Sequence, residues 1–276
     1  MGLPLSRNHD DIKDKDLVPA EARAAAVRHE LQRRRRSETA EYASAPLQLE
    51  EASPFTIKEA GKLTPHRSIC LALRPDCKAA QQYRLLHYKL KEGANPRLIG
   101  VTSAAPQEGK TTVSGNLAFA LAENQQAKVA LVDLNLRSPA MARRLGLSLF
   151  GTLGDQLRLK QRRTSSRWEV LRLRGNLHLM AGGEPLDNPS PLLNSDQVGI
   201  LFDDLAAHYD YVVVDLPAIL IAADTGSIQD YLDALVLVCR AGFSRQANIS
   251  EAAQRLGDRR LSGVLMLDVD GRFVVQ

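Results

Sequence analysis

From about residue 66 onward, short runs of apolar residues alternate with longer segments in which apolar and polar positions follow helical spacing. The short runs have the length expected of buried strands, and the longer segments are typical of amphipathic helices. We expect strands over residues 97–103, 127–135, 177–183, 211–217, 234–242 and 263–269. We expect helices over residues 77–93, 109–124, 138–147, 152–159, 194–210 and 244–258. The alternation predicts an α/β fold, a doubly wound and mostly parallel sheet with helices on both faces.

The first 65 residues differ from the rest, because they are polar and charged and carry only short apolar groups. A helix is plausible over residues 19–38, and the breaks in residues 39–65 indicate a linker. The basic run Arg33–Arg36 belongs either to a solvated helix face or to a surface for anionic lipid or an acidic partner. We therefore expect a partly helical or disordered segment and linker over residues 1–65, and a folded domain over residues 66–276.

Composition narrows the class of protein further. The chain of 276 residues suits one sizeable domain with an appendage, and its net charge of +4 gives no argument for nucleic acid. No secretory signal and no run of about 18 apolar residues is visible, so a cytoplasmic protein is expected. The three cysteines and six histidines show no metal-ligand spacing.

A phosphate-binding loop is the clearest motif. The strand at 97–103 leads through a tight loop into a helix that opens at Gly109-Lys110-Thr111. This order presents backbone N–H groups and a helix N-terminus to a triphosphate, as in a P-loop NTPase, although Ala104 replaces the first glycine of the usual pattern. Lys110 is expected to reach the β- and γ-phosphates, and the Thr111 hydroxyl to bind Mg²⁺. The nucleotide-binding residues that we expect are Ala105, Gln107, Glu108, Gly109, Lys110, Thr111 and Thr112.

Two acidic residues follow apolar strands at the positions where ligands gather in such a sheet. Asp133 ends "VALVD" and Asp215 ends "YVVVD". Ligands of doubly wound sheets lie outside the carboxyl ends of the strands. An aspartate there can hold Mg²⁺, directly or through water, or accept a proton from an attacking hydroxyl.

Together these stretches resemble the bacterial tyrosine kinase (BY-kinase) family, the cytosolic ATPase domains of polysaccharide co-polymerases in capsule and exopolysaccharide synthesis. "TSAAPQEGKTT" resembles the Walker A loop of that family, "ALVDLNLRSP" its Walker A′ element and "YDYVVVDLPA" its Walker B element. "QQYRLLHYKL" resembles the first helix, through which family members pack into rings. The related MinD/ParA-type ATPases carry an extra lysine early in the loop, and Ala105-Pro106-Gln107-Glu108 has none.

The resemblance implies a role for each matching residue. Lys110 would act on the phosphates and is a catalytic candidate together with Asp133, the candidate base for the tyrosine hydroxyl. Thr111 and Asp215 would hold Mg²⁺, and Asn135, which replaces the second acid of the A′ element, can still offer an oxygen. ATP and Mg²⁺ are therefore the expected ligands.

Several departures from the family pattern bear on activity. The ring-forming motif of the first helix keeps Arg84 but has Gln81 and His87 beside it. Leu267 stands where a family asparagine often meets the base. The sequence has no tyrosine after Tyr231, whereas active autokinases of the family usually carry a C-terminal run of tyrosines. Tyr42 is a conceivable acceptor.

A basic segment over residues 157–175 lies between a predicted helix and a predicted strand. It is interpreted as a solvated face, with anionic lipid, an acidic partner or an RNA backbone as alternatives. Because only Trp168 interleaves with the basic residues, a stacking platform for single-stranded nucleic acid is not expected.

The expected function is transfer of the ATP γ-phosphate to protein tyrosine in exopolysaccharide or capsule synthesis. One alternative is a degenerate family member, a nucleotide switch that regulates a membrane co-polymerase without tyrosine phosphorylation. A second alternative is a MinD/ParA-type positioning ATPase. The resemblance implies a membrane polysaccharide co-polymerase as partner, a homo-oligomeric ring through the helix around Arg84, peripheral membrane contact at the inner face, and no nucleic acid.

Overall fold

The computed structural model describes residues 53–93, 95–148, 151–162, 166–222, 224–257, 261–267 and 273–275. Contacts within the chain separate residues 1–50 from residues 51–276, and the second unit is the one described here. The helix expected over residues 19–38, the run Arg33–Arg36 and Tyr42 lie outside the described residues.

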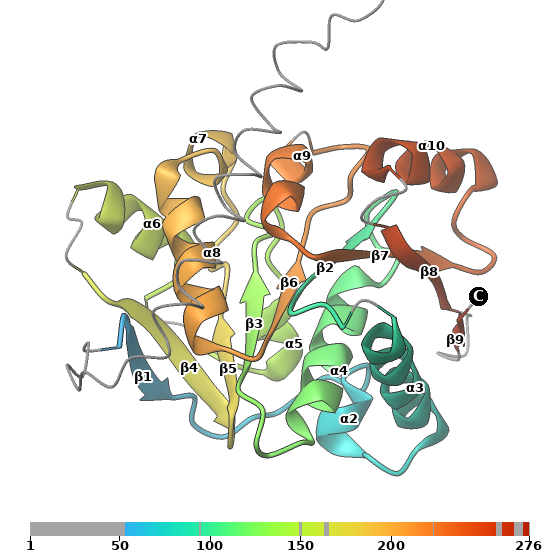
Figure 1. Cartoon of the computed structure of the whole chain (residues 1–276), viewed down its shortest axis with the longest axis horizontal. Helices are drawn as coiled ribbons and strands as arrows, with labels where there is room; N and C mark the ends of the chain where they lie inside the picture. Colours follow the sequence, from blue (N-terminus) through green and yellow to red (C-terminus); the bar gives the residue numbers. More distant parts are fainter. Residues whose placement is uncertain are drawn as a thin grey trace, which may run out of the picture. The chain divides into compact units, whose positions relative to one another are not determined.

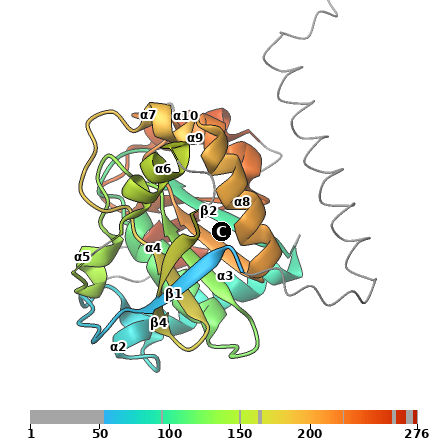
Figure 2. The same cartoon turned by 90° about the vertical axis from the view of Figure 1, so that its left-hand side faces the viewer.

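A nine-stranded sheet runs through the described part of the chain, in the order β1-β4-β5-β3-β6-β2-β7-β8-β9 (Figures 1 and 2). All neighbouring strands are parallel except the pairs β4–β5 and β8–β9, which are antiparallel. The strands are β1 (Phe55–Glu59), β2 (Leu98–Ser103), β3 (Val129–Asp133), β4 (Trp168–Arg174), β5 (Leu177–Met180), β6 (Tyr211–Asp215), β7 (Ala234–Arg240), β8 (Leu261–Leu267) and β9 (Phe273–Val275).

Helices cover both faces of this sheet, which confirms the expected fold class (Figure 1). One face carries α2 (Cys70–Leu73), α3 (Lys78–Glu92), α4 (Lys110–Ala122) and α5 (Met141–Leu145). The other face carries α6 (Leu153–Arg162), α7 (Ser190–Leu193), α8 (Asp196–His208), α9 (Asp224–Ile228), the short 3₁₀ turn η1 (Gln229–Tyr231) and α10 (Gln246–Leu256). Within the described ranges, no helix has both the length and the apolar character that crossing a bilayer requires.

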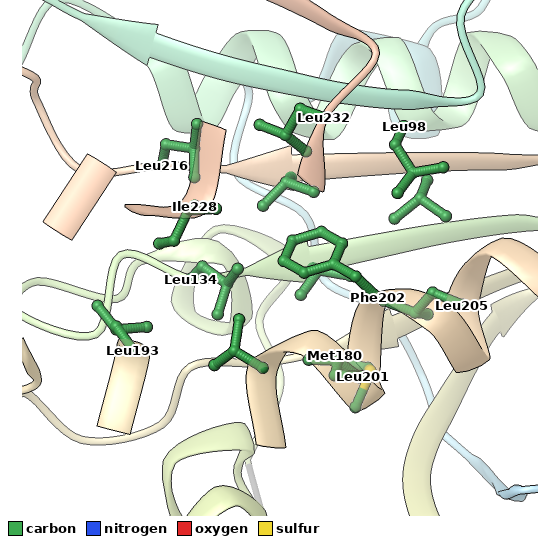
Figure 3. Close-up of a cluster of buried hydrophobic side chains, with 14 of the residues drawn as sticks. Leu98, Leu134, Met180, Leu193, Leu201, Phe202, Leu205, Leu216, Ile228 and Leu232 are labelled. Atoms are coloured by element: carbon green, nitrogen blue, oxygen red, sulfur yellow. The ribbon is translucent and has the colours of Figure 1, made fainter. Parts of the chain in front are cut away.

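The alternation of side chains along each strand divides the interior into two cores. Leu98 of β2 packs on the α8 face, whereas the next residue, Ile99, packs on the α4 face. Val212 and Val213 of β6 divide in the same way, because successive residues of a strand point to opposite faces. Figure 3 shows the α8-side core, in which Phe202 of α8 lies against strand residues. This double burial explains why the central strands are apolar throughout and could be recognised as short runs.

The helices and strands expected from residue 77 onward are confirmed, but the sheet is wider than the pattern indicated. β1 lies inside residues 39–65, the stretch interpreted as a linker, and pairs with β4. Only Phe55 of its five residues is buried, so its sequence carries little strand signal. The N-terminal boundary expected at residue 65 would therefore exclude an edge strand.

The basic segment 157–175 also contains a strand, β4, and is not simply a solvated face. Trp168, Val170 and Leu173 of this strand are buried, whereas the arginines between and after them are not. The Trp168 indole donates a hydrogen bond to Asp204 Oδ2 over 2.7 Å, and the Lys160 ammonium lies 4.1 Å from the centroid of the indole ring. Trp168 thus connects α6, β4 and α8.

Replacing Trp168 by alanine is expected to lower the free energy of unfolding by about 3–5 kcal/mol, because a large cavity and an unpaired Asp204 would result. The measurement is urea unfolding followed by circular dichroism, since Trp168 is the only tryptophan of the chain. Leu159→Ala is the control, because Leu159 is an exposed residue of the neighbouring α6 and should cost less than about 0.5 kcal/mol. Similar losses in the two variants would contradict the prediction.

Candidate nucleotide and phosphotransfer site

The loop between β2 and α4 has a backbone shaped for an anion. Gln107 and Gly109 both adopt left-handed conformations, with φ of 66° and 99°. Such residues turn successive N–H groups into one concave surface. A side chain at position 109 would also collide with Leu267 at the end of β8, which lies directly against Gly109. The left-handed conformation therefore favours glycine at position 109, and any side chain there would also require Leu267 to move.

Two of the expected nucleotide contacts are engaged inside the loop in this structure. The Ala105 N–H donates to Glu108 Oε2 over 2.8 Å, and the Glu108 side chain is buried. The Ser103 hydroxyl donates to the Ala105 carbonyl over 2.6 Å. Ala105 and Glu108 thus brace the shape of the loop.

The first turn of α4 supplies free donors. The first hydrogen bond of the helix runs from the Val113 N–H to the Gly109 carbonyl over 3.0 Å. The N–H groups of Lys110, Thr111 and Thr112 precede it and have no partner within the helix. Together with the positive end of the helix, they can bind phosphate oxygens.

Asp133 and Asp215 lie side by side at the carboxyl ends of adjacent strands. They are register partners in the β3–β6 pair, and neither side chain reaches solvent. Asp133 Oδ2 accepts the N–H groups of Ala140 and Met141 over 3.1 and 3.0 Å, and its Oδ1 accepts the Asn135 N–H over 3.2 Å. Neighbouring strands are only about 4.8 Å apart, so the two carboxyl groups share one small polar site.

The shared burial changes the proton affinity of both aspartates. Loss of water and the neighbouring Asp215 raise the pKa of Asp133 to about 7, although three backbone N–H groups oppose the rise. Burial also raises the pKa of Asp215, while the nearby Lys110 ammonium and the Thr111 and Ser114 hydroxyls oppose that rise. Asp133 therefore has the proton affinity suited to a base near neutral pH.

The oxygen atoms around Asp215 suit a magnesium ion. The Thr111 hydroxyl donates to Asp215 Oδ2 over 2.6 Å, and the buried Ser114 hydroxyl donates to Oδ1 over 3.2 Å. Hydroxyl and carboxylate oxygens are the ligands Mg²⁺ prefers, and Mg²⁺ usually takes few of them from the protein and the rest from phosphate and water. Among the described residues no cluster of three histidine, cysteine or acidic side chains offers a metal a complete protein cage.

Asn135 contacts the acidic pair through its backbone rather than its side chain. Its backbone N–H bonds Asp133, and its side-chain Nδ2 donates to the Ser138 carbonyl over 2.8 Å. The structure therefore brings Lys110, Thr111, Asp133 and Asp215 together and places Asn135 at the edge of the group.

Two further residues of this site were not anticipated. Ser114 lies one helical turn after Lys110 and bonds both the Lys110 carbonyl and Asp215. Arg144 of α5 acts electrostatically on Asp215, and its guanidinium donates to the Ser68 hydroxyl over 2.9 Å. The helical spacing from Thr111 could have indicated Ser114, whereas Arg144 depends on the path of the chain after β3.

The helix expected to form ring contacts has its arginine engaged within the chain. Arg84 of α3 makes two hydrogen bonds to the Glu123 carboxylate after α4, of 2.6 and 2.5 Å. This bidentate pair joins α3 to α4.

Known proteins resemble this chain both in sequence and in fold. The chain is 30% identical over 208 residues to the tyrosine-protein kinase YwqD of Bacillus subtilis, covering 72% of this chain and 85% of the relative. It is 30% identical over 198 residues to the tyrosine-protein kinase CpsD of Streptococcus pneumoniae, covering 70% and 83% of the two chains. The solved kinase domain of the Escherichia coli tyrosine kinase ETK superposes with a TM-score of 0.66 at 25% identity, covering 78% of this chain and 84% of that domain. No family model matches the sequence.

Proposed function

Because this chain belongs to the family of bacterial tyrosine-protein kinases, we propose that it binds Mg²⁺·ATP at the β2–α4 loop and transfers the γ-phosphate to protein tyrosine. The observation that carries the proposal is the pairing of Asp133 with Asp215 beside Lys110 and Thr111. A site for nucleotide binding alone needs one acidic residue for the metal. The second, with a pKa of about 7, is suited to taking a proton from a phenol.

Each residue of the site has a separate role in phosphoryl transfer. The N–H groups of the first turn of α4 and the Lys110 ammonium neutralise the phosphates and hold the γ-phosphate in place. Thr111 and Asp215 would hold a magnesium ion, which would supply positive charge to neutralise the phosphates. Asp133 accepts the tyrosine proton as the phenolic oxygen attacks the γ-phosphorus. Ser114 positions Asp215 through its hydrogen bond, and the Arg144 guanidinium adds positive charge near that carboxylate.

The pathway, partner and location of the protein are inferred from its resemblance to the family. We infer a role in exopolysaccharide or capsule synthesis, with a membrane co-polymerase as partner and a location at the inner face of the cell membrane. Co-purification of the full chain with the cytosolic segment of a co-polymerase, with and without ATP, tests this part separately from the chemistry.

The test of the chemistry is incubation of the full chain with Mg²⁺ and ATP labelled at the γ-phosphate, together with a copolymer of glutamate and tyrosine. Label on tyrosine after acid hydrolysis is the expected result. Free labelled phosphate without any labelled tyrosine would overturn the kinase proposal.

A nucleotide switch without tyrosine phosphorylation is the second candidate. It is favoured by Asn135, whose side chain brings no charge to the metal and bonds Ser138 instead. In that case the full chain would bind or hydrolyse ATP and leave the copolymer unlabelled.

A further inference from the structure

We propose that Tyr88, on the outer face of α3, is a tyrosine that one copy of this chain phosphorylates on a second copy. The inference rests on the proposed kinase function and names a substrate for it.

Tyr88 is the most exposed of the five tyrosines that the structure describes. Its side chain is 57% exposed, whereas Tyr83 and Tyr209 are 2% and 4% exposed. Tyr211 and Tyr231 are half-buried, and the Tyr231 ring stacks on Phe202 with ring centroids 5.0 Å apart. A phosphate acceptor must place its hydroxyl in the site of another protein, and among these five only Tyr88 is free to do so without unfolding.

The surroundings of Tyr88 also suit contact with a second protein. Leu85, one turn earlier on the same face of α3, is 41% exposed, so two large side chains share an uncovered helix face. The Tyr88 hydroxyl interacts with the Glu92 carboxylate one turn later, and this interaction raises the pKa of Tyr88. The phenol therefore remains protonated near neutral pH and needs a base to become a nucleophile.

The topology requires that the donor be a second copy. Tyr88 follows His87, whose ring lies 6.0 Å from that of Tyr211, the first residue of β6. Asp215 ends the same strand four residues later, about 13 Å away along the strand. Tyr88 is thus level with the amino ends of the strands, and the phosphate site is at their carboxyl ends. No rotation of the side chain can bridge that distance within one chain.

The transfer is balanced within two copies and one ATP. The Tyr88 oxygen of one copy bonds to the γ-phosphorus of ATP held by the other copy. The bond between that phosphorus and the β–γ bridging oxygen breaks, and ADP leaves with the bond electrons. The phenolic proton passes to the base of the donor copy, for which Asp133 is the proposed group.

A phosphate on Tyr88 would have a specific neighbour. Arg84 lies one helical turn before Tyr88 and holds Glu123 through two hydrogen bonds. Side chains four residues apart on a helix are neighbours, and a phosphate dianion competes well for a guanidinium. Phosphorylation would therefore loosen the link between α3 and α4, the helix that begins at the phosphate loop.

The experiment uses the full chain with Mg²⁺ and γ-labelled ATP, followed by mapping of phosphopeptides by mass spectrometry. Label at Tyr88 is expected, and Tyr88→Phe should lose most of it while phosphorylating the glutamate–tyrosine copolymer at the rate of the wild type. Tyr42→Phe is the matched control and should keep the label. Retained label in Tyr88→Phe, or its loss in Tyr42→Phe instead, overturns the proposal.

A mixing experiment tests transfer between copies. The Lys110→Met chain, which should not donate phosphate, is given an affinity tag and incubated with untagged wild type. Label on the tagged chain at Tyr88 is expected, and a tagged Lys110→Met/Tyr88→Phe chain should stay unlabelled at that position. Absence of label on the tagged chain while the wild type labels itself excludes transfer to a second copy.

Labelling of the copolymer distinguishes a failure of the Tyr88 proposal from a failure of the proposed kinase function. Labelled copolymer without labelled Tyr88 leaves the kinase function intact and rejects this inference. If neither becomes labelled, both are rejected. Mapping the site on the wild-type chain requires no variant, so a folding defect of Tyr88→Phe, detectable by circular dichroism, cannot obscure the result.

Discussion

Replacing Lys110 by methionine is expected to reduce tyrosine labelling by about a hundredfold to a thousandfold, the usual cost of removing one charged donor from a transition state. Lys110 is the first residue of α4, is largely buried, and lies close enough to Asp215 to lower the pKa of that carboxyl. Methionine keeps the length and the apolar part of the side chain but removes the ammonium. The loss should therefore be one of charge at the phosphates, measured as initial rates of copolymer labelling.

The matched control is Lys62→Met, which makes the same substitution at an exposed lysine. It should retain the wild-type rate. Calorimetry of ATP binding adds a second readout, because the loss of Lys110 should weaken the affinity for ATP more than for AMP, which lacks the β- and γ-phosphates. A Lys110→Met chain that labels the copolymer as well as Lys62→Met would show that phosphate is transferred elsewhere in the molecule.

Asp133→Asn is expected to lower the rate of transfer to tyrosine by about a hundredfold to ten-thousandfold, the usual contribution of a general base. Nucleotide binding should survive, because the asparagine oxygen can still accept the Ala140 and Met141 N–H groups that now bind Asp133. The measurements are copolymer labelling for the rate and calorimetry for the affinity. An Asp133→Asn chain with unchanged rate would show that another group takes the proton.

The pH dependence gives an independent check on the same residue. A base works only when deprotonated, and burial beside Asp215 raises the pKa of Asp133 to about 7. The wild-type rate should therefore rise as pH increases through about 7 and become constant above it. Asp133→Asn should show no such rise. A wild-type rate that does not change between about pH 5.5 and 8.5 would contradict the role of Asp133.

The central part of the fold could be predicted because its strands are buried on both faces. Residues such as Val212 and Val213 must both be apolar, so β6 appears in the sequence as an unbroken run. The edge strands could not be recognised in this way. β1 buries one residue of five, and β4 mixes buried Trp168, Val170 and Leu173 with Glu169, Arg172 and Arg174, which are not buried. The charged residues therefore interrupt the strand pattern of β4, which is recognised only from its pairing with β1 and β5.

The clustering of the candidate site residues was predictable for a related reason. Asp133 and Asp215 end their strands, Lys110 and Thr111 begin the helix after β2, and parallel strands bring their carboxyl ends to one edge. Arg144 and the bond between Ala105 and Glu108 were not predictable, because they depend on how loops close over the site. Ser195 is a smaller example: it is the N-cap residue of α8, but its hydroxyl donates to the Leu192 carbonyl and makes no cap hydrogen bond.

The buried pair of aspartates makes the nucleotide-free kinase less stable at neutral pH than at mildly acidic pH. Between the ordinary value of 3.8 and about 7, the folded chain keeps a proton at Asp133 that the unfolded chain releases, so the free energy of unfolding falls as pH rises through this window and stays lower above it. Magnesium and nucleotide bind only the folded form, so they raise the free energy of unfolding again by mass action. The unfolded population of the chain at neutral pH should therefore fall when Mg²⁺ and nucleotide are present in excess.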